Sequence, residues 1–447
     1  MTTDSEALNL LEDLIKKAKA LGADAADALV FESAALSHSQ RLGQTERMER
    51  EESRDLGLRV FKGQRQAMVS STDMADETLS ALAERAVAMA GQVPEDEYCG
   101  LADPELLATT IPEIDLYDAE EPTPETLIER ARLCEEAAMA VSGVTNSEGA
   151  EAGWGSTHVA LATSTGFAAS YASSGHSVGI AVLAGEGSGM ERDYDFSSAV
   201  YGSDLEASDA IGRKAGEKAV RRLNPQKPAT GHASVVFDPR TSGGLLRHLA
   251  GAINGAGIAR GTSFLKDKLD AQIFAEGITI VDDPHRPRGL SSKPFDGEGV
   301  ANKRRSIVEN GRLTTWIMDL RSSRQLGLAT TGHASRGTSS PPSPSTTNLH
   351  MEAGSQSPDE LIADISSGIY VTELMGMGVN GVTGDYSRGA AGFWIENGVI
   401  THAVSEATIA GNLKDMFLNL TPANDLVFRY GTNAPTLRIE GMTIAGA

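Results

Sequence analysis

Two Asn-Gly pairs, each set between stretches rich in apolar residues, constrain the fold of this chain more than any other sequence feature. They are Asn310-Gly311, in SIVENGRLTTWIM, and Asn397-Gly398, in FWIENGVITHAV. Both residues of such a pair tolerate a positive φ angle, which the type I′ turn requires and which matches the twist of paired strands. Each pair predicts a β-hairpin, so the second half of the chain is expected to be mainly antiparallel β structure.

The first half of the chain combines helical and strand-like patterns. Leucine, isoleucine and alanine recur at helical spacing from Leu8 to Leu21, and Gly22 is expected to end that helix. An antiparallel meander is predicted from Ala28 to Ser71. The later elements are predicted in the order helix (about 76–90), helix (124–141), strands (144–201) and helix (204–223). This order predicts the α+β fold class.

The length and one proline-containing segment predict two domains. A single core rarely exceeds roughly 250 to 300 residues, and the chain has 447. The segment NPQKPATG, from Asn224 to Gly231, follows a basic helix end and carries the clearest boundary signal. We predict an N-terminal α+β domain over 1–228 and a C-terminal β-rich domain over 229–447, the latter carrying one helix at 242–257.

The charge balance disfavours several classes of partner. Lys and Arg total 39 against 61 Asp and Glu, which gives a net charge of −22 that repels phosphate backbones. The short basic clusters 218–222 and 303–305 are interpreted as solvated surface charge. The N-terminal segment is acidic and amphipathic, and no run of about 18 apolar residues occurs. We therefore expect a cytoplasmic protein that binds neither nucleic acid nor a membrane.

Several chemistries lack their usual sequence patterns. Neither a phosphate-binding G-x-x-x-x-G-K-[ST] loop nor a G-x-S-x-G nucleophile elbow occurs, and AGEGSG near Gly185 is interpreted as a turn. The nine histidines are isolated in sequence, and Cys99 and Cys134 are interpreted as ordinary buried or half-buried thiols. The Ser-, Pro- and Gly-rich segment 332–348 is either a flexible surface loop or a loop at a binding cleft.

A series of segments in the second half matches one known family in the family's order. The segments are SVVFDPRTSGGLLRHLAGAINGAGIARGTSFL from Ser234, ITIVDDP from Ile278, GLSSKPFDGEGV from Gly289, SIVENGRLTTWIMD from Ser306, PSTTNLHM from Pro344, SPDELIADISSGIYV from Ser357, and GFWIENGVITHAVSEATIAGNL from Gly392. Their ordered combination resembles the TldD/PmbA family of peptidase-related proteins (peptidase U62), formerly called modulators of DNA gyrase. The first half agrees mainly in its order of elements.

The resemblance also identifies where catalysis would lie in this family. Active members carry H-E-x-x-x-H on a helix and a cysteine near the C-terminus as zinc ligands. Aligning LLRHLAGA with that helix places Arg247 at the first ligand, His248 at the glutamate and Ala252 at the second ligand, and FRYGTNAPTLRIEG has no cysteine. A zinc site needs about three protein ligands. The resemblance therefore implies no cofactor and no catalytic residue in this chain.

These substitutions are similar to those of the metal-free subunit type of the family, called PmbA or TldE. The resemblance implies a TldD-like metallopeptidase partner that carries the zinc, and unfolded peptide as the substrate. Strand edges could hold such a peptide by main-chain pairing. Arg247, His248, Thr347 and Asn348 are the candidate peptide-binding residues, and a homodimer is expected to be possible without the partner.

Two alternatives remain open from the residues. Isolated histidines can converge in a fold, so a self-sufficient metallopeptidase with an unrecognised site is one alternative. A homodimeric peptide-binding scaffold without a proteolytic partner is the other. Metal analysis tests the first alternative, and co-purification from the native host tests the second.

Overall fold

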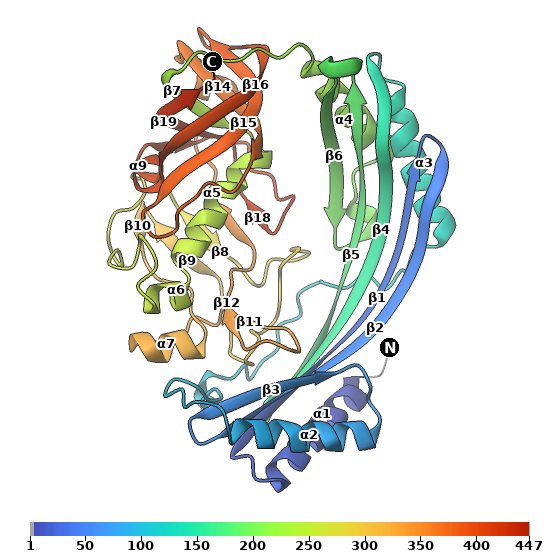
Figure 1. Ribbon diagram of the computed structural model, residues 1–447, viewed down its shortest axis with the longest axis vertical. Coiled ribbons are helices and arrows are strands. Elements are labelled where there is room, and N and C mark those ends of the chain that lie inside the picture. Colours follow the sequence, from blue (N-terminus) through green and yellow to red (C-terminus); the bar gives the residue numbers. More distant parts are fainter. Residues whose placement is uncertain (1–3, 447) are drawn as a thin grey trace.

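A computed structural model describes residues 4–446, and the first half of these residues forms one large curved sheet (Figure 1). The sheet is antiparallel throughout and has the strand order β3-β2-β1-β4-β5-β6. Its strands are β1 (Ala25–Arg41), β2 (Gln44–Lys62), β3 (Arg65–Ser71), β4 (Val144–Thr163), β5 (Ala168–Ala184) and β6 (Glu191–Ala199). The predicted meander corresponds to β1, β2 and β3.

Four helices cover one face of this sheet in two pairs, α1 (Asp4–Ala20) with α2 (Asp76–Ala90), and α3 (Pro124–Met139) with α4 (Ser208–Arg221). Each pair buries an apolar stripe and forms its own core with the strands beneath it. Helices α3 and α4 approach very closely, because a Cβ atom on Gly212 would lie 1.9 Å from the carbonyl oxygen of Cys134. Figure 1 shows the second half of the chain on the side of the sheet opposite to α3 and α4.

The second half contains two main sheets around one large core. The first has the order β16-β15-β14-β7-β19-β17, and β16 also pairs with β19, so five of its strands close into a barrel. Its strands are β7 (Gly231–Phe237), β14 (Ser367–Met375), β15 (Asp385–Glu396), β16 (Val399–Asn412), β17 (Leu420–Pro422) and β19 (Leu437–Ala445). The second has the order β10-β9-β8-β13-β18, with β8 (Ile280–Asp282), β9 (Arg305–Glu309), β10 (Arg312–Leu313), β13 (Leu349–Met351) and β18 (Thr432–Asn433).

Short helices and one small ribbon complete this half. The helices are α5 (Pro239–Ala252), α6 (Gly255–Ala259), α7 (Leu320–Leu326), α8 (Pro358–Ile362) and α9 (Leu413–Leu418), and the ribbon pairs β11 (Ala334–Ser335) with β12 (Ser343–Pro344). Among residues 4–446, no helix has the length and apolar character needed to cross a membrane.

The structure confirms the α+β fold class and both predicted hairpins. Asn310 and Gly311 have φ angles of 48° and 79° between β9 and β10, and Asn397 and Gly398 have 49° and 77° between β15 and β16. Parallel pairing occurs at β7–β14 and β13–β18, and the other pairs of this half are antiparallel. Residues 222–230 connect α4 to β7, where the division into two domains is our proposal.

The predicted helix over 242–257 is wrong in its extent. Helix α5 begins at Pro239, with Asp238 as its N-cap, and ends at Ala252. The break after it arises because Asn254 caps α6 and donates from Nδ2 to the carbonyl of Pro344 at 2.8 Å. Gly255 donates its N–H to the carbonyl of Ile317 at 2.8 Å. Contacts with distant segments therefore replace the helical hydrogen bonds that the local sequence would have supported.

Candidate functional site

Helix α5 places the three substituted metal-helix positions in different environments. Ala252 is buried with 4% exposure, in the core that also contains Leu245 and Leu249. Arg247 lies on the exposed face and makes no hydrogen bond or ion pair with any other residue of the described range. His248 is half-buried, and its ring contacts Tyr386 edge to face at a centroid distance of 5.9 Å. Helix α5 is thus packed in the core through the face that carries Ala252.

The side chains at these positions do not fit a zinc ion. A guanidinium offers only donors and a methyl group offers no ligand atom, so Arg247 and Ala252 leave His248 as the single imidazole. Burial lowers the pKa of His248, and the positive charges of Arg388 and Arg247 lower it further. Within residues 4–446, no group of three or more His, Cys, Asp or Glu residues is arranged to hold a metal.

The candidates Thr347 and Asn348 lie in a buried polar network before β13. Asp282 accepts hydrogen bonds from Thr347 N at 2.7 Å and Thr347 Oγ1 at 2.6 Å, and its Oδ2 lies 3.1 Å from His333 Nε2. Asn348 donates from Nδ2 to Ser292 Oγ at 2.7 Å. Thr347 and Asn348 are 4% and 1% exposed. Their polar groups hold neighbouring loops together, and their contact with peptide stays a prediction.

Asn348 also lines a cavity of about 210 Å³ beside the end of β6. The guanidinium of Arg286 lies over the ring of Phe428, 3.3 Å from its centroid, and His350 contacts the same ring at 5.0 Å. Tyr430 belongs to the same cavity wall, whereas Arg247 and His248 do not. The predicted peptide-binding residues therefore lie in two separate places, Arg247 and His248 on α5, and Thr347 and Asn348 before β13. Sequence reasoning missed Arg286 and Phe428, although Arg286 precedes the family-like segment from Gly289 by only three residues.

At the free edge of β6, main-chain groups of residues 194 and 196 are hydrogen-bonded to side chains of the strand itself and of Arg429. Asp193 Oδ1 accepts the N–H of Tyr194 at 2.7 Å, and Asp195 Oδ1 accepts the N–H of Phe196 at 2.9 Å. The carbonyl of Phe196 is bound by Arg429. Polar edge groups that are already bonded cannot pair with another strand. These groups at the centre of the edge are therefore not available for main-chain pairing with a peptide.

The same two aspartates join α4 to the second half of the chain. Arg240, in α5, contacts Asp193 Oδ1 at 2.7 Å. Lys218, in α4, lies 3.2 Å from Asp195, and Arg222, which follows α4, lies 3.7 Å from Asp193. The interpretation of the cluster 218–222 as solvated surface charge is therefore wrong for Arg222, which is only 9% exposed, whereas Arg221 is exposed. Lys218 and Arg222 pair with carboxylates of β6 that lie 23 and 29 positions away in sequence, so local sequence did not indicate these contacts.

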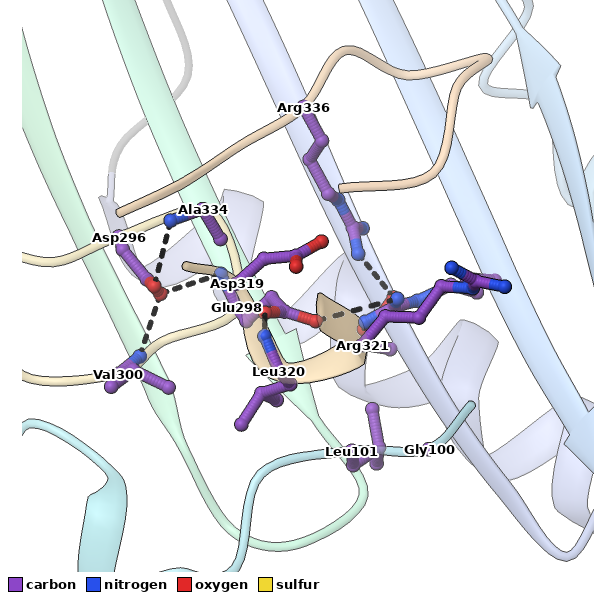
Figure 2. A network of polar contacts seen from close by, with 12 residues as sticks. Gly100, Leu101, Asp296, Glu298, Val300, Asp319, Leu320, Arg321, Ala334 and Arg336 are labelled. Atoms are coloured by element: carbon purple, nitrogen blue, oxygen red, sulfur yellow. Dashed lines mark hydrogen bonds and ion pairs between the residues drawn. The ribbon is translucent and has the colours of Figure 1, made fainter. Parts of the chain in front are cut away.

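A second polar link joins the long sheet to loops of the second half (Figure 2). Arg336 Nη1 donates to Asp27 Oδ1 at 2.8 Å, and Arg59 Nε donates to Asp27 Oδ2 at 3.0 Å. Arg59 Nη1 lies 3.7 Å from Glu298 Oε1, and Glu298 accepts the N–H of Leu320 at 2.9 Å. Ionisable side chains from β1, β2 and two loops are thus buried together.

The two carboxyl groups of this network respond to burial in opposite ways. Burial alone would raise the pKa of Asp27, but Arg336 and Arg59 together hold it below its usual value. Burial raises the pKa of Glu298 to about 8, and the single distant guanidinium of Arg59 only partly opposes that rise. Asp27 is therefore ionised at neutral pH, whereas Glu298 is mostly protonated.

The Ser-, Pro- and Gly-rich segment 332–348 carries Arg336 into this network. Both of its ends are buried, whereas residues 339–341 at its middle are exposed as in a surface loop. A Cβ atom on Gly57 would lie 2.4 Å from the carbonyl oxygen of Thr338, so the loop backbone packs directly on β2. Residues 334–336 line a second cavity at this contact. The segment is therefore a loop at a cavity between the sheet and the second half.

Three family models match consecutive parts of the chain. They describe a PmbA/TldA metallopeptidase domain 1 over residues 26–90, a central domain over 117–223 and a C-terminal domain over 230–446.

Whole-chain similarities extend this match. The chain is 38% identical to Metalloprotease PmbA of Escherichia coli O157:H7, covering 98% of this chain and 96% of that protein. It is 35% identical to a Metalloprotease PmbA homolog of Haemophilus influenzae, covering 99% and 96%. A crystal structure from Bacteroides thetaiotaomicron, proposed to be a modulator of DNA gyrase, superposes with a TM-score of 0.92 at 30% identity and full coverage of both chains. TldE from Thermococcus kodakarensis shares the fold, with a TM-score of 0.88 at 22% identity over 97% of this chain and 99% of that one.

Proposed function

The chain belongs to the PmbA/TldD metallopeptidase family, and from this premise we propose that it is a metal-free, PmbA-type subunit. In this proposal it works with a zinc-bearing, TldD-like metallopeptidase partner to process unfolded peptides. The zinc of the partner would polarise the scissile carbonyl and activate a water molecule. This chain would supply walls that hold and orient the peptide.

The observation that carries the proposal is the chemistry of helix α5. Its two ligand positions hold Arg247, which is exposed, and Ala252, which is buried in the core and has no donor atom. Restoring a ligand at Ala252 would require a large side chain in a packed interior, which typically costs 1 to 3 kcal/mol as a rough range. The absence of a ligand at Ala252 is thus fixed by the packing of the helix, whereas Arg247 lies on its exposed face.

Arg247 is the side chain of α5 best suited to touch a peptide. Its guanidinium is exposed and has no partner among residues 4–446, so its donors are free for an external acceptor. A guanidinium binds a carboxylate in a planar, two-bond arrangement. We assign Arg247 the binding of an acidic side chain or of a peptide terminus. Main-chain pairing with a peptide would use an edge other than β6, such as residues 44–55 of β2, which pair with β1 alone.

Co-expression with a TldD-like chain that keeps an intact H-E-x-x-x-H helix tests partner, metal and function together. We expect a stable complex that cleaves an unfolded peptide, with about one zinc per complex and none in this chain purified alone. The matched control is the triple variant Arg247→His, His248→Glu, Ala252→His without the partner, which should remain inactive because further ligands and their supporting residues are missing.

The two alternatives give different results in the same experiment. Tightly bound stoichiometric zinc and peptide cleavage by this chain alone would replace the proposal with a self-sufficient metallopeptidase. A homodimer that binds peptide, and that neither associates with the TldD-like chain nor supports cleavage, would replace it with a peptide-binding scaffold.

A further inference from the structure

A cavity of about 150 Å³ lies where the long sheet meets the second half of the chain. Its sheet wall is apolar and consists of side chains from β1, β4 and β5: Leu29, Phe31, Val159, Leu161 and Tyr171. The rings of Phe295 and Tyr171 meet edge to face at a centroid distance of 5.4 Å. Leu29 and Leu161 are buried, whereas Phe31 and Tyr171 are half-buried and Ser335 is exposed. The cavity thus has an apolar floor and a partly open rim.

The opposite wall of the cavity contains a buried cation with unused donors. The side chain of Arg336 is 1% exposed, and only its Nη1 has an acceptor, on Asp27. Its Nε and Nη2 atoms are buried and have no hydrogen-bond acceptor within residues 4–446. Buried polar groups in proteins are almost always bonded, so two open donors on one guanidinium point to an acceptor that the chain itself does not provide.

The charges around Arg336 favour an anion as that acceptor. Asp27 is shared between Arg336 and Arg59, which approach its two oxygens separately. Glu298 is mostly protonated at neutral pH, because burial raises its pKa to about 8. Asp319 also acts on Arg59, but its Oδ1 caps α7 by accepting the N–H of Ser322.

The cavity wall itself adds one cationic and one carboxyl side chain. Lys293 Nζ donates to the carbonyl of Ala334 at 3.0 Å, and burial lowers the pKa of its ammonium. The oxygens of Asp296 accept backbone N–H groups of Glu298, Val300 and Ala334, and burial raises the pKa of this carboxyl group. The oxygens of Asp296 are thus engaged by backbone donors, and neither accepts a hydrogen bond from the open donors of Arg336.

We propose that this cavity binds a carboxylate attached to an apolar group, with Arg336 receiving the carboxylate and the sheet wall receiving the apolar group. An apolar cavity of about 150 Å³ accommodates a molecule the size of benzene. The fitting groups are the C-terminal residue of a peptide that ends in Phe or Leu, and a free aryl or alkyl carboxylic acid. The peptide source rests on the proposed function, whereas binding of the carboxylate does not.

Isothermal titration of the full chain, without a partner, tests the proposal with four ligands. They are the peptide Ala-Ala-Phe with a free C-terminus, the same peptide as its C-terminal amide, phenylacetate, and acetate. We expect the free-acid peptide to bind at least tenfold more tightly than its amide, because the amide brings a donor to the donors of Arg336. Phenylacetate that binds as tightly as the free-acid peptide would identify a small acid as the occupant. Acetate should bind at least tenfold more weakly than phenylacetate.

Two variants locate the binding and one variant is the control. Arg336→Gln should reduce affinity for the free acid at least tenfold, but it also removes the bond to Asp27. Val159→Phe fills the cavity and leaves the bonds of Arg336 in place, so it should reduce affinity by the same factor with an unchanged circular dichroism spectrum. Ser339→Ala, which is exposed in the same loop and does not line the cavity, should change affinity less than twofold.

The outcomes distinguish the carboxylate site from the role as a metal-free subunit. Equal affinity for acid and amide, no binding by any ligand at millimolar concentration, or unchanged binding by Val159→Phe would each overturn the carboxylate site. Failure of cleavage with a TldD-like partner would overturn the metal-free subunit and leave these titrations unaffected.

Discussion

Replacing Glu298 by Gln should make the stability of this protein less sensitive to pH. Glu298 is 4% exposed, accepts the N–H of Leu320 at 2.9 Å and lies 3.7 Å from Arg59 (Figure 2). Burial raises its pKa from 4.5 to about 8. A glutamine can keep the accepted hydrogen bond through its Oε1 atom, and it carries no proton that titrates in this range.

The sign and size of the effect follow from the two pKa values. Between 4.5 and about 8 the unfolded chain has lost the proton that the folded chain still holds, so rising pH favours unfolding. Between these two pKa values, each rise of one pH unit lowers the free energy of unfolding by about 1.4 kcal/mol. Raising the pH from 6 to 9 should therefore remove about 2 to 3 kcal/mol of the free energy of unfolding from the parent, and this loss should be absent in Glu298→Gln.

Urea unfolding at pH 6 and pH 9, followed by the fluorescence of Trp154, Trp316 and Trp394, measures this difference. The matched control is Glu135→Gln, which loses hydrogen bonds to the β1–β2 turn. The pKa of the Glu135 carboxyl group is below its usual value despite its burial. The deficit of this variant relative to the parent should be the same at both pH values, since that carboxylate is ionised throughout. If Glu298→Gln and the parent lose equal stability between pH 6 and 9, the raised pKa of Glu298 does not cause the loss of stability at high pH.

Three further predictions concern packing and the candidate site. Gly212→Ala should lower the free energy of unfolding by about 2 to 3 kcal/mol, because the new methyl group would lie 1.9 Å from a carbonyl oxygen of α3. Gly231→Ala, with no atom within 4 Å, is its control and should change stability by less than about 0.5 kcal/mol in urea unfolding. Arg247→Ala should also stay within about 0.5 kcal/mol and leave metal content unchanged while weakening peptide binding, and a large loss of stability would reveal an internal partner. Thr347→Val should cost about 1 to 3 kcal/mol by leaving Asp282 Oδ2 with one bond fewer, and a neutral result would show that this network does not stabilise the loops.

The elements that the sequence predicted well are those with local causes. Asn310-Gly311 and Asn397-Gly398 favour the same φ angles in any context, so both hairpins followed from four residues. The helix over 76–90 agrees with α2 at both ends, because its apolar stripe is encoded within fifteen residues. The family segments likewise identified the metal helix and its substitutions at Arg247 and Ala252.

The tertiary structure alone decided which charged residues meet and where cavities lie. Asp27 and Arg336 are separated by 309 positions, and no periodicity or spacing relates them. The break after Ala252 and the burial of Arg222 have the same kind of cause, since both depend on acceptors from other elements. Local backbone preferences act over a few residues, whereas the desolvation of a charge depends on every segment that packs around it. For that reason the sequence by itself determined the Asn-Gly turns, the helix over 76–90 and the family of this protein, and only the folded chain determined the end of α5, the buried ion pairs and the Arg336 cavity.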